Sequence, residues 1–328
     1  MTLPNTDQSL SEQEMQDAMA PIMEGNASED EIAAFLTAMA QRGETVDEIT
    51  GAARILRTKA ATIKAPEDAL DCCGTGGDGI GTYNISTAVA LVAAACGVPV
   101  AKHGNRAASS KSGAADALEA LGINLDVPHE KLSAALEQFN FCFLMAPRHH
   151  EALKHVVPVR KKLGFRTIFN LLGPLANPAD TKLQLIGVFD PKWLIPMAET
   201  LNRLGTKRAW LVHGSDGLDE ITTTGPTRIV TLDNGAVTER TLTPEDFGLP
   251  IAKSEDLLGG DAAENAQALK DLLAGKPSAY RDIVLANTAA VLNVHGNTAL
   301  TAGVTAAAEA IDSGRAQDVL ARYREFTA

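Results

Sequence analysis

The chain of 328 residues has few cysteines, few aromatic residues and no long apolar run. Its four cysteines, at positions 72, 73, 96 and 142, follow neither the spacing of a metal site nor that of a disulfide framework. We therefore expect buried thiols in a reducing compartment, and hence a cytoplasmic protein. The polar, acidic N-terminal segment is unlike a signal peptide. No stretch approaches the roughly 20 apolar residues of a membrane span, so we expect no membrane partner.

The sequence also has fewer basic than acidic residues. The sequence has 29 lysines and arginines against 41 aspartates and glutamates, which gives a formal net charge of -12. This balance disfavours a broad surface for nucleic acid or for an anionic membrane. Any phosphate group must instead be held locally, by lysine, arginine, backbone N–H groups or a metal ion.

Glycine, by contrast, is concentrated in one place. Residues 74–79 read Gly-Thr-Gly-Gly-Asp-Gly, between an apolar strand predicted at 69–73 and a helix predicted over 86–96. Glycine tolerates positive φ and lets bare N–H groups approach a ligand. Together with the positive end of the helix dipole, such a loop favours a phosphate. The alternative is a tight connection without a ligand.

A second polar loop follows the next predicted strand, residues 98–102. Lys102, Arg106 and Lys111 supply positive charge there, and Asn105 with three nearby serines supplies neutral hydrogen-bonding groups. Open α/β sheets bind ligands at the carboxyl ends of their strands. We therefore predict a second phosphate-binding loop, against the alternative of a solvated basic surface.

The pattern of the chain changes near residue 65. Before it, three capping boxes (Ser or Thr with Glu three residues later) precede apolar residues at helical spacing. We predict a helical domain over 1–65, with helices from about 160–180 as candidates to join it. It shows no convergent polar cluster, so we interpret it as packing or dimerisation surface. Over 66–328, strands and helices alternate, which predicts an α/β domain with a mainly parallel central sheet flanked by helices.

Adjacent carboxylates, Asp219 and Glu220, follow a strand predicted over 208–212 on a glycine-rich loop. Such acids are often merely solvated. At a strand end of a phosphate-binding sheet they favour Mg²⁺ instead, because this hard cation takes oxygen ligands and keeps substrate phosphates in its shell.

An arginine and a histidine are candidates for binding an organic acid. Arg160 lies on a helix predicted over 149–163, and its planar fork matches a carboxylate. The competing interpretation is an ordinary helix-surface arginine. His150 follows a predicted buried strand, and it is interpreted either as a partner of an aromatic acid or as a core or capping histidine.

In this order and spacing, these motifs resemble those of the anthranilate phosphoribosyltransferase family over nearly the whole chain. The segments that carry the resemblance are residues 74–78, 84–87, 102–106, 159–164, 166–178 and 213–220. The resemblance implies a helical domain plus an α/β domain, a fold shared with pyrimidine nucleoside phosphorylases. It also implies transfer of phosphoribose from phosphoribosyl pyrophosphate (PRPP) to the amine of anthranilate in tryptophan synthesis, by a Mg²⁺-dependent homodimer. One departure is Glu151, where the family commonly has proline.

The resemblance further implies roles for individual residues. Those implied for PRPP are Gly74, Gly77, Asp78, Thr82, Asn84, Ile85, Ser86, Thr87, Lys102, His103, Gly104, Asn105, Arg106, Ala107, Ala108, Ser109 and Ser110. Those implied for anthranilate are Gly74, Asn105, Arg160, His103, His150 and Pro174. Two Mg²⁺ ions are assigned to Ser86, Asp219 and Glu220.

The chemistry expected of such a site needs no covalent enzyme nucleophile, because the lone pair of an aromatic amine is available without removal of a proton. Asn105 is assigned to orient the amine, and His103 to accept a proton afterwards. Two alternatives share the architecture or descend from it. One is a pyrimidine nucleoside phosphorylase, which would not need the paired acids; the other is a non-catalytic nucleic-acid-binding relative, which would need a basic face.

Overall fold

The computed structural model describes residues 3–107 and 111–328, and it begins with a bundle of three helices. These are α1 (Glu12–Met23), α2 (Glu29–Arg42) and α3 (Val46–Thr58). The predicted capping boxes are confirmed: Ser11, Ser28 and Thr45 each accept the N–H of the glutamate three residues later, and that glutamate accepts the cap N–H in return. The ends of the bundle helices were therefore readable from the sequence.

The bundle contains one buried ionic cluster, which corrects the prediction of no convergent polar groups. Glu48 is fully buried and accepts hydrogen bonds from the Arg42 guanidinium (2.5 Å) and from the Leu10 N–H (2.9 Å). Its other oxygen completes the Thr45 cap at 2.8 Å. Such a carboxylate is tolerated inside because its lone pairs are used. The partners are separated in sequence, so the pattern did not reveal them.

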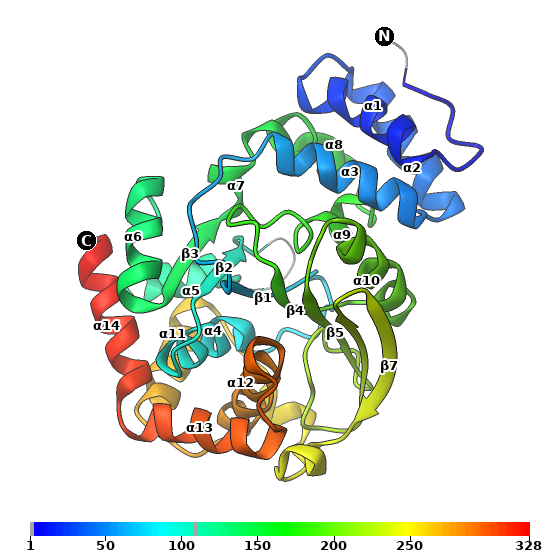
Figure 1. Ribbon diagram of the computed structural model, residues 1–328. Coiled ribbons are helices and arrows are strands. Elements are labelled where there is room, and N and C mark those ends of the chain that lie inside the picture. Colours follow the sequence, from blue (N-terminus) through cyan, green and yellow to red (C-terminus); the bar gives the residue numbers. More distant parts are fainter. Residues whose placement is uncertain (1–2, 108–110) are drawn as a thin grey trace.

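Within the residues that the structure describes, a single sheet of seven strands carries the rest of the fold, in the order β3-β2-β1-β4-β5-β6-β7 (Figure 1). The strands are β1 (Leu70–Gly74), β2 (Val100–Gly104), β3 (Phe141–Met145), β4 (Leu183–Gly187), β5 (Arg208–Gly214), β6 (Thr227–Asp233) and β7 (Ala236–Leu242). The first five run parallel, and β6 and β7 form the predicted antiparallel hairpin. Its turn places Asn234 and Gly235 at positive φ. The prediction of a mainly parallel sheet is confirmed.

Helices cover both faces of this sheet. They are α4 (Ile85–Ala95), α5 (Ala114–Ala120), α6 (His129–Phe139), α9 (Phe169–Leu172), α10 (Leu194–Arg203), α11 (Ala262–Leu273), α12 (Ala279–Gly296), α13 (Leu300–Asp312) and α14 (Arg315–Thr327). Short 3₁₀ segments are η2 (Pro191–Trp193), η3 (Pro244–Phe247) and η4 (Ser254–Leu257). In Figure 1, α4, α12 and α13 lie on one side of the strands and α10 on the other.

The single helix predicted over 149–163 is wrong. The chain instead forms α7 (Ala146–His149), the 3₁₀ segment η1 (Glu151–His155) and α8 (Val157–Leu163). Pro158 stands in the first turn of α8, where its missing N–H costs nothing but where it ends any preceding helix. The proline therefore explains why η1 does not continue into α8, whereas α7 ends earlier, at His150 with φ of -123° and ψ of 58°.

Among residues 3–107 and 111–328, two groups of buried apolar side chains hold the elements together. One lies between the sheet and α4, α12, α13 and α14. The other joins the N-terminal bundle to residues 156–176, to α10 and to the opposite face of the sheet. The segments near 160–180 thus pack with the bundle, whereas the division of the chain at residue 65 stays a prediction.

No helix in the described part of the chain is long and apolar enough to cross a membrane.

Candidate functional site

The site lies at the carboxyl ends of β1 and its two neighbours, β2 and β4. At this point successive connections leave the sheet in opposite directions, which is where open α/β sheets bind ligands. The loop after β1 has the expected conformation, with Gly76, Gly77 and Gly79 at φ of 66°, 77° and 79°. A side chain at these positions would be strained, so the glycine cluster is required by the backbone.

The acidic loop after β5 folds over the glycine loop. The Gly76 N–H donates to Asp219 Oδ2 at 2.9 Å. A Cβ at Gly74 would collide with the Asp219 carboxylate, and one at Gly187 would collide with its main chain. Glycine at the ends of β1 and β4 therefore permits a close approach that brings Asp219 and Glu220 to the strand ends.

The two carboxylates lie in an environment that opposes their negative charge. Burial, together with the charge of Asp78, raises the pKa of Asp219 to about 7. Burial and the neighbouring Asp219 raise the pKa of Glu220 well above its usual range, while Lys102 acts in the opposite direction. A cation placed among them would relieve this repulsion, and their oxygens are the ligands that Mg²⁺ prefers.

Lys102 links the first two strand ends. Its ammonium donates to the carbonyl of Cys72 at 2.7 Å and to Ser86 Oγ at 3.0 Å. The side chain is 1% exposed, so a cation is held inside the sheet within reach of the start of α4. Glu220 lies close to Lys102 and to the backbone of Ser86. No group of three or more His, Cys, Asp or Glu residues that could hold a metal ion occurs within residues 3–107 and 111–328, so the assignment of metal ligands stays a prediction.

The start of α4 is fixed by side chains from distant parts of the chain. Asn84 Oδ1 accepts from the Asn265 amide at 3.0 Å, and the Asn84 amide donates to the Ser112 carbonyl at 3.3 Å. The Tyr280 hydroxyl donates to the Asn84 carbonyl at 3.2 Å. Of the other predicted residues here, Thr82 bridges to Leu258, whereas Ile85 and Thr87 are buried within the α4 start. These last two are positioned to pack rather than to present side chains to solvent.

The histidines of the site meet on the opposite side of β2. His103 Nδ1 donates to the Gly173 carbonyl at 3.1 Å, and its ring lies 5.2 Å from that of His150. Burial lowers the pKa of His103 to about 3 and that of His150 to about 4, so both rings are neutral near pH 7. Among the described atoms, His103 Nε2 has no hydrogen-bond partner. A buried nitrogen of this kind is available to a ligand.

The segment 173–177 lies beside these rings and carries Pro174, the predicted ring wall. The Gln184 amide donates to the Pro174 carbonyl at 2.8 Å, and Arg57 Nε donates to the Leu175 carbonyl at 2.6 Å. The Asn177 amide donates to the Ala101 carbonyl at 2.8 Å. The strands β4 and β2 and the bundle helix α3 thus hold this wall.

Arg160 is half-buried on α8, with its guanidinium 5.7 Å from the centre of the Phe169 ring. Burial lowers its pKa, and none of the carboxylates in the described ranges forms an ion pair with it. An arginine desolvated without a counter-charge is suited to an anionic ligand. This environment favours the binding interpretation over that of a surface arginine.

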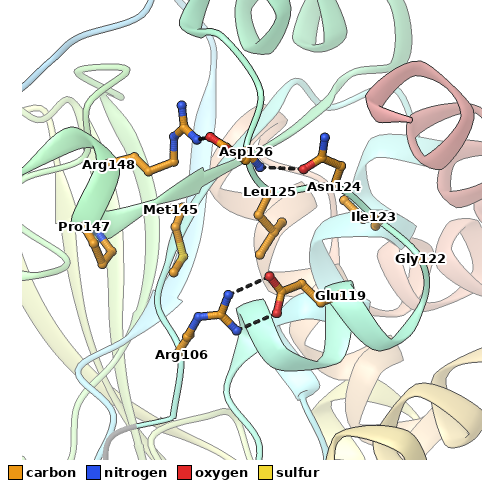
Figure 2. Close-up of a pocket in the computed structure, with 10 residues that line it drawn as sticks. All are labelled: Arg106, Glu119, Gly122, Ile123, Asn124, Leu125, Asp126, Met145, Pro147 and Arg148. Atoms are coloured by element: carbon orange, nitrogen blue, oxygen red, sulfur yellow. Dashed lines mark hydrogen bonds and ion pairs between the residues drawn. The ribbon is translucent and has the colours of Figure 1, made fainter.

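The loop after β2 is only partly placed at the site. Arg106 points into a cleft of about 550 Å³ beside β3, where it pairs with Glu119 at 2.5 and 2.6 Å (Figure 2). Figure 2 also shows Arg148 paired with Asp126 across this cleft. Asn105 is exposed, and its side-chain oxygen accepts the Arg106 N–H. The predicted residues Ala108, Ser109 and Ser110 lie outside the described residues.

The sequence analysis missed several residues that contact the glycine loop or lie buried next to the strand ends. Arg166 donates to the Gly77 carbonyl and lies 4.2 Å over the Phe189 ring, which connects the α8–α9 loop to the glycine loop. Asp71, Asn177 and Gln184 are buried within or beside the sheet. A charged or amide residue inside an otherwise apolar strand was the available signal for Asp71 and Gln184.

The fold and the site together define a glycosyltransferase with a helical bundle and an α/β domain. The family model described as "Glycosyl transferase family, a/b domain" matches residues 66–317, and that described as "Glycosyl transferase family, helical bundle domain" matches residues 5–60. More particularly, the chain belongs to the anthranilate phosphoribosyltransferase family, as its relatives show.

Three of these relatives illustrate the similarity. The anthranilate phosphoribosyltransferase of Rhodospirillum rubrum is 58% identical over 318 residues, which are 97% of this chain and 92% of the relative. The crystal structure of anthranilate phosphoribosyltransferase from Thermus thermophilus superposes with a TM-score of 0.93 at 45% identity, covering 98% of this chain and 97% of that one. The Saccharomyces cerevisiae enzyme in complex with PRPP and Mg gives 0.91 at 28% identity, covering 99% and 96%.

Membership of this family decides between the alternatives weighed from the sequence. The chain is a pentosyl-transferring enzyme of tryptophan biosynthesis, rather than a nucleoside phosphorylase or a nucleic-acid-binding relative. The Saccharomyces cerevisiae relative was solved in complex with PRPP and Mg.

Proposed function

We propose that this chain transfers phosphoribose from PRPP to the amine of anthranilate at the carboxyl ends of β1, β2 and β4, with release of pyrophosphate. The observation that carries the proposal is the convergence of Lys102, Ser86, Asp219 and Glu220 on the glycine loop. Donors for an anionic diphosphate and oxygen ligands for a cation meet there. The residue roles below are part of this proposal.

On the donor side, the N–H groups of the glycine loop and the Lys102 ammonium bind the diphosphate. Negative charge develops on the diphosphate as the anomeric C–O bond breaks, so fixed positive groups at this point stabilise the transition state. Ser86, Asp219 and Glu220 would hold Mg²⁺, which supplies further positive charge to the diphosphate when bound. We propose two ions, because Ser86 and the acidic loop approach the diphosphate site from different strands.

On the acceptor side, Arg160 binds the carboxylate of anthranilate through its planar fork. Pro174 forms a wall for the aromatic ring, and His150 and His103 lie against it. The neutral His103 ring keeps Nε2 free to take the proton that the amine loses after attack. Asn105 orients the amine, so that nitrogen and anomeric carbon are held in line.

The deciding experiment is a coupled assay of phosphoribosyl anthranilate formation with and without magnesium, on the natural protein and on Arg160→Ala. We expect turnover that requires magnesium and that Arg160→Ala reduces through the KM for anthranilate. Absence of turnover with PRPP, anthranilate and magnesium all present would overturn the proposal. Phosphorolysis of thymidine or uridine in its place would favour the phosphorylase alternative.

We also propose that the chain forms a homodimer through its helical domain. Val157 at the start of α8 and Phe165 just after α8 are 54% and 45% exposed, although α8 packs on the bundle. Large apolar side chains exposed at both ends of one short helix favour a protein contact. Sedimentation should give a dimer, and Val157→Asp with Phe165→Asp should give a monomer. A natural protein that sediments as a monomer would remove this part of the proposal.

We propose the cytoplasm as the compartment of this enzyme. All four cysteines are free, which suits a reducing environment. Cell fractionation should recover the protein with cytoplasmic markers; recovery with an oxidising compartment would contradict this.

A further inference from the structure

The ladder of backbone pairs between β1 and β2 stops after the first residue of β1, on the side of the sheet that leads to the site. We call the gap in this ladder the opening. The register between these strands contains the pair Leu70↔Val100, whereas β1 pairs with β4 from Leu70↔Leu183 to Gly74↔Gly187. Beyond Leu70, β1 therefore stays paired with β4 but is no longer paired with β2.

Side chains occupy the opening and use the main-chain groups that the ladder leaves. Asp71 Oδ1 accepts the N–H of His103 at 3.0 Å, and Lys102 Nζ donates to the Cys72 carbonyl at 2.7 Å. The Asn177 amide donates to the Ala101 carbonyl at 2.8 Å. Because buried backbone groups must be paired, these three side chains replace hydrogen bonds between strands.

A carboxylate and an ammonium group, those of Asp71 and Lys102, lie together in the opening. Asp71 is 0% exposed and Lys102 is 1% exposed. Burial raises the pKa of the Asp71 carboxyl, while the charge of Lys102 and the hydrogen bonds from Asn177 and His103 act in the opposite direction. An isolated charge in this position would be costly, so each of the two makes the other tolerable.

We propose that Asp71 is a positioning residue for the transfer reaction, which acts from inside the sheet through Lys102 and His103. It fixes the main chain of β2 at His103, and it balances the ammonium that contacts Cys72 and Ser86. Because Asp71 is fully buried beneath the strand ends, it does not touch the substrates itself. The inference rests on the proposed roles of Lys102 and His103.

Two substitutions can separate the effect of the Asp71 hydrogen bond from the effect of its charge. Asp71→Asn keeps an oxygen for the His103 N–H but removes the charge that balances Lys102, and it turns an amide donor toward the Asn177 amide. Lys102→Met removes the opposite charge with a side chain of similar length. Asp318→Asn, on an exposed ion pair of α14, is the matched control.

The test compares the natural protein, Asp71→Asn, Lys102→Met and the double variant, with kcat and both KM values measured below the unfolding transition. We expect Asp71→Asn to lower kcat at least tenfold and to raise the KM for PRPP at least fivefold, whereas a loss of folded protein alone would leave KM unchanged. In the Lys102→Met background, the same substitution should change kcat less than twofold. Additive effects in the two backgrounds would overturn the inference.

A thermal unfolding cycle on the same four proteins gives a readout that does not depend on activity. The double variant should unfold at a higher temperature than Asp71→Asn, because it no longer buries an unbalanced ammonium. A double variant no more stable than Asp71→Asn would overturn the inference, and this holds even if Asp71→Asn is too unstable to assay. If the natural protein shows no transfer, the proposed function fails, whereas the unfolding cycle still decides whether Asp71 balances Lys102.

Discussion

The donor side and the acceptor side of the site are built differently. On the donor side, polar groups already have partners inside the protein: Lys102 bonds Cys72 and Ser86, and Asp219 accepts the Gly76 N–H. On the acceptor side, Arg160 is desolvated without a counter-charge and His103 Nε2 lacks a partner within the described residues.

This difference indicates two modes of recognition. In the proposed function, a multiply charged sugar diphosphate would be met by a preformed set of N–H groups, a buried ammonium and carboxylates for metal, so little reorganisation would be needed when charge develops. The proposed aromatic acid would be met by unsatisfied groups, whose desolvation would be relieved when it binds. We therefore expect donor-side variants to affect the rate and acceptor-side variants to affect the KM for anthranilate.

The largest expected effect is on the donor side. Glu220→Gln should lower kcat/KM by roughly 100-fold or more, because one carboxylate of the metal set is lost where leaving-group charge develops. The magnesium concentration for half-maximal rate should rise in the same assay. Glu137→Gln, on the exposed face of α6, is the control and should leave both values unchanged. A normal rate and magnesium requirement in Glu220→Gln would show that the acidic loop does not serve the donor.

The next effect tests the acceptor side. Arg160→Gln should raise the KM for anthranilate roughly 10- to 100-fold, as expected for loss of hydrogen bonds to a charged group worth about 1.5–3 kcal/mol. The KM for PRPP should stay the same, and Arg322→Gln on α14 should change neither. If the KM for PRPP rose instead, the division between the two sides would be wrong.

A smaller effect is expected from the support of the acceptor wall. Gln184→Leu leaves the buried Pro174 carbonyl without its donor, which should cost about 1–3 kcal/mol in the free energy of unfolding. Chemical denaturation measures this cost. Gln267→Leu, exposed on α11, should cost much less. Equal losses in the two variants would show that the wall is not held by this hydrogen bond.

The smallest effect is a pH dependence. Burial lowers the pKa of His150 to about 4, so the unfolded chain takes up a proton near pH 6.5 before the folded chain does. The stability that the neutral ring provides is therefore complete above pH 6.5 and is lost as the pH falls toward about 4. The difference in unfolding free energy between the natural protein and His150→Asn should shrink over this window. Both proteins contain the buried carboxylates, so their opposite contribution cancels in this difference of unfolding free energies. A difference that stays constant with pH would contradict the neutral state of His150.

Local patterns predicted much of this molecule. The capping boxes fixed the first three helices, and strand–loop–helix alternation gave the parallel sheet and the places where Ser86, Lys102 and the Asp219–Glu220 pair lie. These features depend on neighbours in sequence, or on the rule that strand ends share one edge.

What the sequence did not show depends on long-range packing. The Glu48 cluster, the opening at Asp71 and the Arg166–Gly77 contact each join segments whose proximity is set by the tertiary fold. The direction of Arg106, toward Glu119 rather than the strand ends, depends on a competing ion pair that the motif does not contain. The break before α8 was readable from Pro158 and was overlooked.

The clamped stretch from Gly173 to Asn177 has a consequence for altering what this enzyme accepts. Its main chain is fastened by three carbonyls and by the Asn177 amide, and the side chains of Leu175 and Ala176 are buried in the core that joins the bundle to the sheet. Libraries that vary position 174 while keeping Leu175 and Ala176 should therefore yield catalysts for substituted aromatic amines, with the machinery for sugar activation inherited intact.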